Sequence, residues 1–283
     1  MKNIVVPIDF SEYSQSAAKT GVFLAQKTGA QLHLLHVVNA PADWNRMPVK
    51  AQQHYPEIEG RMVEAEIKLD ALVAGSLFKN IETQTHVYAG VAYDQIAQFA
   101  KTYKMDLVVM GAHGAGESGG LFIGSTAQRV IRMASCPVLS VKKDHPLNSV
   151  KNILFPSDFE EDTISNLNTI KNLAGYLRSS VNVLFVNTPN NFVDSETSEK
   201  RMSKFIPVQK EVKFNSFVYN DFEKEKGILR FSENKKIDMI AMVTHKRKSK
   251  PNYLLGITET ILFHSNIPVL SIINSSGRYM PSV

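Results

Sequence analysis

The chain has 283 residues, of which 43% are hydrophobic and 21% charged, a composition that suits two globular domains with a core in each. No stretch reaches the roughly 18 consecutive apolar residues of a membrane helix, and the single cysteine, Cys136, excludes an internal disulfide and a cysteine zinc site. We therefore expect a cytoplasmic protein without membrane contact. The net charge of +5 is carried by interspersed residues of both signs, which argues against a nucleic-acid partner.

The first half of the chain alternates short Val/Ile/Leu-rich runs with segments of helical period, a pattern typical of βαβ units and a parallel sheet. Residues 39–56 contain three prolines and predict a long loop, and Ser11 is a suitable N-cap for the first helix. The predicted strands lie near 3–8, 31–38, 82–88, 106–110 and 137–141, and the predicted helices near 13–28, 57–78, 91–103 and 121–134.

The second half repeats the first in the same order. NIVVPIDFSE at 3–12 matches NILFPSDFEE at 152–161, and LHLLHVVN at 32–39 resembles VNVLFVNT at 181–188. MDLVVM at 105–110 matches IDMIAM at 237–242, and CPVLSV at 136–141 matches IPVLSI at 267–272. The chain is thus a tandem duplication, with domains predicted at 1–145 and 150–275. In the second domain we expect strands near 152–156, 181–187, 211–219, 238–243 and 268–273, and a shorter second helix within 194–206.

A glycine-rich segment, GAHGAGESGGLFIGST, directly follows the strand MDLVVM and leads into a helix. Glycines let a backbone approach a ligand closely, and a helix N-terminus offers free N–H groups that suit phosphate. The residues in this pattern are Gly111, Gly114, Gly124, Ser125 and Thr126, whose spacing differs from a P-loop because no lysine follows the last glycine. The alternative is a surface connection without a ligand.

Asp9 ends the first strand, and each domain is expected to be a Rossmann-like five-stranded parallel sheet of order 3-2-1-4-5 with helices on both faces. In that order strands 1 and 4 flank the point where ligands bind open α/β sheets, so Asp9 and the glycine segment would face one crevice. The carboxylate could accept hydrogen bonds from a ribose or a base; alternatively, Asp9 only caps the following helix.

These residues together resemble a tandem universal stress protein. VPIDFSE at 6–12, LLHVVN at 34–39, the G-x2-G-x9-G-S segment at 111–125 and CPVLSV at 136–141 carry the resemblance, which covers both halves. It implies a nucleotide-responsive stress protein that binds ATP or a related adenine nucleotide such as AMP or ADP, with Mg or Mn on the phosphates. It places Asp9 and Val37 at the adenosine, and Gly111, Gly114, Gly124, Ser125 and Thr126 at the phosphates. It also implies an intramolecular pseudo-dimer of the two domains, and leaves a homodimer of whole chains open.

The second copy departs from this pattern. Gly111, Gly114 and Ser125 are replaced by Val243, Lys246 and Ile257, whereas Asp158 keeps the place of Asp9. Side chains at two of these glycine positions would keep a phosphate from the backbone, so we expect a degenerate second domain. Lys246, Arg247, Lys248 and Lys250 form a basic cluster there, either a solvated loop or a site for an anionic partner.

The sequence contains none of the G-x-S-x-G, H-E-x-x-H or C-x-x-C motifs. No catalytic residue is therefore assigned, although slow ATP hydrolysis or phosphotransfer is an alternative to binding alone. A scaffold whose glycine segment is a relic is a further alternative.

Overall fold

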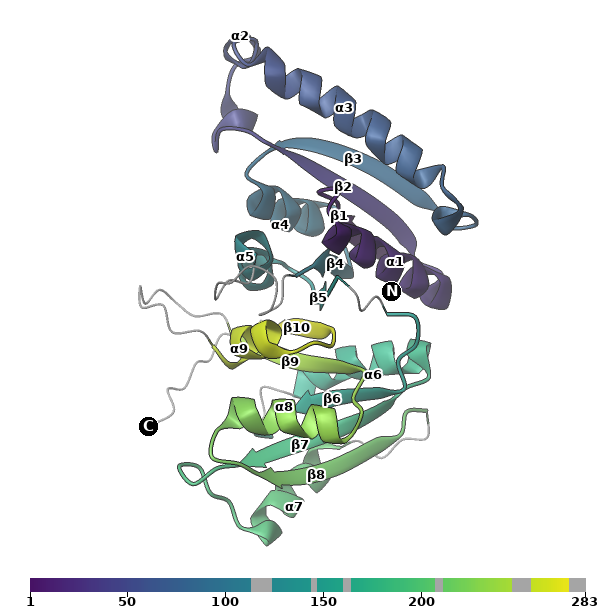
Figure 1. Ribbon diagram of the computed structural model, residues 1–283. Helices are drawn as coiled ribbons and strands as arrows, with labels where there is room; N and C mark the ends of the chain where they lie inside the picture. Colours follow the sequence, from purple (N-terminus) through teal and green to yellow (C-terminus); the bar gives the residue numbers. More distant parts are fainter. Residues whose placement is uncertain (113–123, 144–146, 160–163, 207–210, 246–255, 275–283) are drawn as a thin grey trace. The chain divides into compact units, whose positions relative to one another are not determined.

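The computed structural model describes residues 1–112, 124–143, 147–159, 164–206, 211–245 and 256–274 (Figure 1). Their contacts divide the chain into two compact units, with the boundary between Leu147 and Asn148. Each unit contains one copy of the repeated strand motifs, and the two are described separately.

The N-terminal unit is a five-stranded parallel sheet in the order β3-β2-β1-β4-β5. α1 packs against β1 and β4, α3 covers β2 and β3, and α4 and α5 pack against each other. The predicted strand order is therefore confirmed. The elements are β1 (Asn3–Pro7), α1 (Glu12–Thr28), β2 (Gln31–Asn39), η1 (Trp44–Arg46), α2 (Val49–Gln52), α3 (Pro56–Val73), η2 (Ser76–Phe78), β3 (Thr83–Gly90), α4 (Ala92–Thr102), β4 (Leu107–Gly111), α5 (Ser125–Met133) and β5 (Val138–Val141).

The apolar runs form this sheet because both of its faces are covered by helices. Ile4, Val5 and Val6 in β1 are all fully buried. Ser11 caps α1 as predicted, since its side chain accepts a hydrogen bond from the Ser14 amide, and Gly29 ends the helix with φ of 71°. Cys136 is buried with 8% of its surface exposed, and burial raises the pKa of its thiol to about 12, so it packs as a small apolar residue.

Two expectations for this unit were wrong. The helix expected at 57–78 ends at Val73, and Leu77, which the helical period placed on the buried stripe, is 37% exposed while Phe78 is buried. The period extends past Gly75, where the chain leaves the helix. The expected loop at 39–56 contains η1 and α2; the residue before α2 is Pro48, whose restricted φ suits a helix start.

The C-terminal unit repeats the topology, with the order β10-β9-β6-β7-β8 and all pairs parallel. The helix that follows β7 is short, as predicted, with 11 residues against 18 in α3. The elements are β6 (Asn152–Pro156), α6 (Ile164–Leu177), β7 (Ser180–Asn187), α7 (Ser195–Phe205), β8 (Phe214–Asn220), α8 (Lys224–Asn234), β9 (Met239–His245), α9 (Ile257–His264) and β10 (Val269–Asn274).

Candidate functional site

The candidate site lies in the N-terminal unit, at the sheet edge where the parallel strands end. β1 pairs with β2 on one side and with β4 on the other, so the strand order reverses between β1 and β4. Asp9 follows β1, Val37 lies near the end of β2, and Gly111 is the last residue of β4. The structure therefore brings these three predicted residues to one edge of the sheet, with Asp9 and Gly111 on the two strands that flank the switch point, where α/β sheets bind ligands, and Val37 one strand further along.

Asp9 is a fixed carboxylate. Its Oδ1 accepts hydrogen bonds from the Ser11 amide at 3.0 Å and from the Ser11 hydroxyl at 2.5 Å. Partial burial of the carboxyl acts to raise its pKa, but the hydrogen bonds from Ser11 outweigh this and hold the pKa below its ordinary value. The side chain is thus ionised at neutral pH. The alternative that Asp9 itself caps the helix was wrong, because Ser11 is the N-cap and Asp9 holds Ser11 in place.

Phe10 has a left-handed backbone, with φ of 64°, and its repeat counterpart Phe159 has φ of 61°. A bulky residue at positive φ is strained, so the surrounding contacts must hold it there. The Phe10 ring packs against His36 with centroids 4.9 Å apart, and the Lys68 ammonium lies 5.6 Å above the ring. The sharp turn between β1 and α1 is therefore built into both copies and sets the direction of the aspartate that precedes it.

A cavity of about 200 Å³ adjoins this turn, between the end of β2 and α3. The β2 side includes His36, whose Nδ1 lies 2.7 Å from the Ile8 carbonyl oxygen and ties the ends of β1 and β2 together. Val37 and Phe10 both line this cavity, and Phe10 directly follows Asp9 in the chain. The cavity is lined by Phe10, His36, Val37, Val38, Asn39, Arg61, Glu64, Ala65 and Lys68.

Gly111 has a structural reason to be glycine that the sequence did not reveal. A Cβ added there would lie 2.6 Å from the Tyr13 Cβ and 2.7 Å from the Tyr13 carbonyl carbon. The missing side chain lets the first turn of α1 pack onto the end of β4. Only the tertiary contact shows this, because nothing in the sequence links positions 13 and 111.

The N-terminus of α5 carries the other predicted residues. Gly124 is the N-cap and Ser125 and Thr126 open the helix, whose first turn holds no acidic residue. Amide groups and two hydroxyls therefore lie at the positive end of the helix dipole. Gly114 and the basic cluster at 246–250 lie outside the described residues.

The matched helix of the second unit, α9, differs at its third residue. Glu259, at the place of Ala127, accepts a hydrogen bond from the Gly256 amide at 2.6 Å and is only 6% exposed. The Thr244 hydroxyl donates to the Thr258 hydroxyl at 3.3 Å, whereas the residue matched to Thr244 in the first unit is Ala112. The protein's own carboxylate thus occupies this helix end. Aligning the two loops one residue further would have revealed Glu259 in the sequence.

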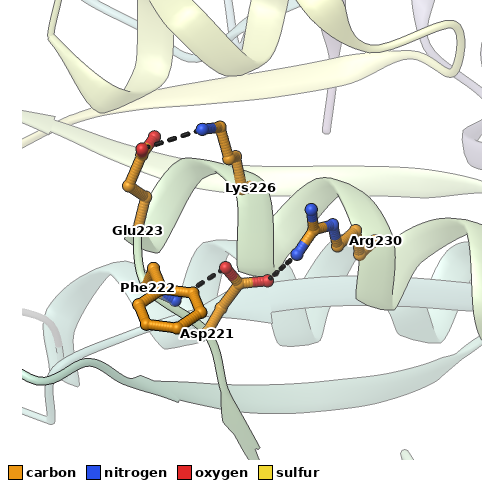
Figure 2. Close-up of polar contacts among 5 residues, drawn as sticks. All are labelled: Asp221, Phe222, Glu223, Lys226 and Arg230. Atoms are coloured by element: carbon orange, nitrogen blue, oxygen red, sulfur yellow. Dashed lines mark hydrogen bonds and ion pairs between the residues drawn. The ribbon is translucent and has the colours of Figure 1, made fainter.

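Another polar cluster in the second unit surrounds the turn from β8 into α8 (Figure 2). Asp221 accepts hydrogen bonds from the Phe222 amide at 2.7 Å and from Arg230 at 2.9 Å, and Lys226 pairs with Glu223 at 2.8 Å. These pairs neutralise the charges within the turn. We therefore assign the cluster a structural role, which is to stabilise the start of α8.

The fold and the switch-point site define a Rossmann-like α/β protein built from two copies of one domain. The Universal stress protein family profile matches residues 1–142, and the chain belongs to this family. A universal stress protein of Methanocaldococcus jannaschii is 32% identical over 150 residues, which are 50% of this chain and 82% of that relative. Universal stress protein G of Escherichia coli O157:H7 is 34% identical over 143 residues, 50% of this chain and 99% of the relative.

The likeness of fold extends through both units. The crystal structure of a universal stress protein from Archaeoglobus fulgidus has a TM-score of 0.77 at 18% identity and covers 96% of this chain and 98% of that one. Among the described residues, no helix combines the length and the apolar character needed to cross a lipid bilayer.

Proposed function

We propose that the N-terminal domain binds ATP or a related adenine nucleotide and that the protein acts as a nucleotide-responsive stress protein. The observation that carries the proposal is the ionised Asp9 carboxylate, which Ser11 fixes at the switch point, directly before Phe10 in the wall of the cavity that Val37 also lines. A carboxylate there can accept hydrogen bonds from ribose hydroxyls, while the apolar wall of the cavity suits a base.

The phosphates would lie at the start of α5. Backbone N–H groups and a dipole end favour an anion there, and Ser125 and Thr126 would add hydroxyl donors. Gly114 and Gly124 would allow the backbone to come close. We propose Gly111 as the start of this segment, although its contact with Tyr13 already requires a glycine.

A divalent metal such as Mg or Mn would bind mainly through the phosphates. No group of three His, Cys, Asp or Glu suited to a metal occurs within the part of the chain that the structure describes. Phosphate oxygens and water are the ligands that Mg prefers in nucleotide sites. In the proposed complex the metal would be held by phosphate oxygens and water.

Isothermal titration of the full chain with ATP, ADP and AMP tests the proposal, together with mass spectrometry of small molecules released from the denatured protein. We expect one site per chain, lost in Gly114→Lys, which copies the second repeat. Absence of both binding and a co-purified nucleotide would favour the scaffold with a relic segment. ATP turnover above background that disappears with Asp9→Asn would instead favour the weak ATPase.

A further inference from the structure

The solvent face of α3 carries a second apolar stripe, distinct from the stripe that packs on the sheet. Ile58, Ala65 and Leu69 form the inner stripe and are at most 4% exposed. On the opposite side, Val63 is 53% exposed and Ile67 is 65% exposed. The exposed stripe runs at intervals of three or four residues through Gly60, Val63, Ile67, Ala71 and Ala74. Such spacing places the five residues on one line along the helix.

The matched helix of the second unit has no such stripe. α7 buries Ser198, Met202 and Phe205 and exposes only charged residues and serines along its described length. Both helices follow the second strand of their unit. An exposed apolar line is therefore not required by this position in the fold, and its presence on α3 needs another explanation.

Acidic side chains border the stripe. α3 contains five acidic residues and two basic ones, although the whole chain has a net charge of +5. The two basic residues, Arg61 and Lys68, are exposed on the side of α3 that borders the cavity, where Lys68 pairs with Glu64 at 2.6 Å. Glu59, Glu66 and Asp70 are exposed. Their spacing of seven and four residues places them along one margin of the stripe.

We propose that this face of α3 binds an amphipathic helix of a partner protein whose apolar stripe is bordered by lysine or arginine. Val63 and Ile67 would insert between the partner's apolar residues, and the small residues at 60, 71 and 74 would let the helix axes approach to about 8–10 Å. Lysine or arginine on the facing margin of the partner would meet the acidic margin of α3 formed by Glu59, Glu66 and Asp70. A second α3 or an anionic membrane would place like charges together, so the charge pattern favours the basic helix.

A synthetic helix provides the probe. A fluorescein-labelled peptide of about 18 residues, the length of α3, would carry leucines at helical spacing and lysine or arginine along one margin of that apolar stripe. A twin peptide would carry glutamate at every basic position. In anisotropy titrations of the full chain, we expect the basic peptide to bind at least about tenfold more tightly than its twin, and more weakly as salt rises from about 0.05 to about 0.3 M.

Two variants separate the apolar and the charged contributions. Val63→Ser with Ile67→Ser should weaken the basic peptide at least about tenfold, since both contacts lie at the centre of the stripe. Val49→Ser, at a 71% exposed valine on α2, is the matched control and should bind as wild type does. Glu66→Lys with Asp70→Lys keeps the apolar stripe and should shift the preference toward the acidic twin, so the test remains decisive even if the serine variant folds poorly.

Chemical shifts in ¹⁵N-labelled protein should change along α3 when the basic peptide is added. Equal affinity for the two peptides, or undiminished binding by the serine variant, would overturn the proposal. A concentration-dependent dimer in sedimentation that the serine variant abolishes would assign the stripe to a second copy of the chain. Binding to anionic phosphatidylserine vesicles that the same variant abolishes would assign it to a membrane; either result also overturns the proposal.

Discussion

The N-termini of α5 and α9 show how one duplicated site is arranged in two ways. Both helices follow the fourth strand of their unit and begin after a glycine N-cap, Gly124 or Gly256. α9 satisfies its first amide group with Glu259, whereas α5 has Ala127 at the same place. One helix end therefore holds a carboxylate of the protein itself, whereas among the described residues the other has no side-chain cap and no acidic residue in its first turn.

Other residues around the two helix N-termini also differ between the units. The first unit has Ala112 where the second has Thr244 paired with Thr258, and Ser125 where the second has Ile257. The comparison teaches that a cap and a ligand compete for the same amides at a helix N-terminus, so the proposed phosphate site requires the α5 amides to be left to the ligand.

The largest effect is expected from moving that carboxylate into the first unit. Ala127→Glu should weaken ATP binding at least about 100-fold, roughly 2.7 kcal/mol, because the new side chain would compete with phosphate for the same amides and repel it. Isothermal titration measures the loss. Glu259 shows that the matched position accepts this side chain while buried.

Ala127→Gln is the control for size. Its amide oxygen can also accept a hydrogen bond from the N-cap but carries no charge, so we expect a loss of only about tenfold. Equal losses in the two variants would mean that bulk rather than charge closes the site. Unchanged ATP affinity in Ala127→Glu would show that the phosphates lie elsewhere.

Asp9 and Asp158 offer the next comparison, since the two aspartates occupy matched positions. Asp9→Asn should weaken nucleotide binding about tenfold, because an amide still holds the turn but accepts a weaker hydrogen bond from ribose than a carboxylate does. Asp158→Asn should change nothing. Titrations of both variants with ATP and with adenosine test this, and equal effects would contradict a site confined to the first unit.

The sequence predicted the strands, their order and the place of Asp9 because these depend on local patterns, namely buried runs such as Ile4–Val6 and a repeated motif order. It did not predict why position 111 is glycine, since the contact with Tyr13 joins residues far apart in the chain. The sequence did not identify Glu259 as a cap, because a cap can be assigned only once the helix start is known. The end of α3 was misplaced because a periodic pattern continues past Gly75 while the helix does not.

A smaller effect is expected at the second helix end. Glu259→Ala should lower the stability of α9 by about 1 kcal/mol, the usual contribution of an N-terminal cap. It should not create a nucleotide site, since Val243 and Ile257 remain. Hydrogen exchange of the α9 amides measures the change, with Glu196→Ala on the first turn of α7 as the exposed control. ATP binding gained by Glu259→Ala would show that the carboxylate alone had closed the second site.

The smallest effect concerns a polar pair inside each sheet. His33 Nδ1 lies 3.1 Å from His86 Nε2 in the first unit, whereas the matched residue of His33 in the second unit is Asn182, which accepts a hydrogen bond from Asn215 at 3.0 Å. Burial lowers the pKa of both histidines below 6.5, and for His33 the proximity of His86 adds to this. An amide pair does not titrate, so only the first unit should respond to mild acid.

The sign follows from proton linkage. Below pH 6.5 the unfolded histidines take up protons more readily than the folded ones, so the stability of the first unit is complete above that pH and falls as the pH decreases toward the lowered values. Urea unfolding should give a lower free energy of unfolding at about pH 5.5 than at about pH 7.5. This difference should be smaller in His33→Asn and unchanged in His54→Asn, an exposed control. A pH response that is the same in His33→Asn and wild type would assign it to other groups and remove this difference between the two units.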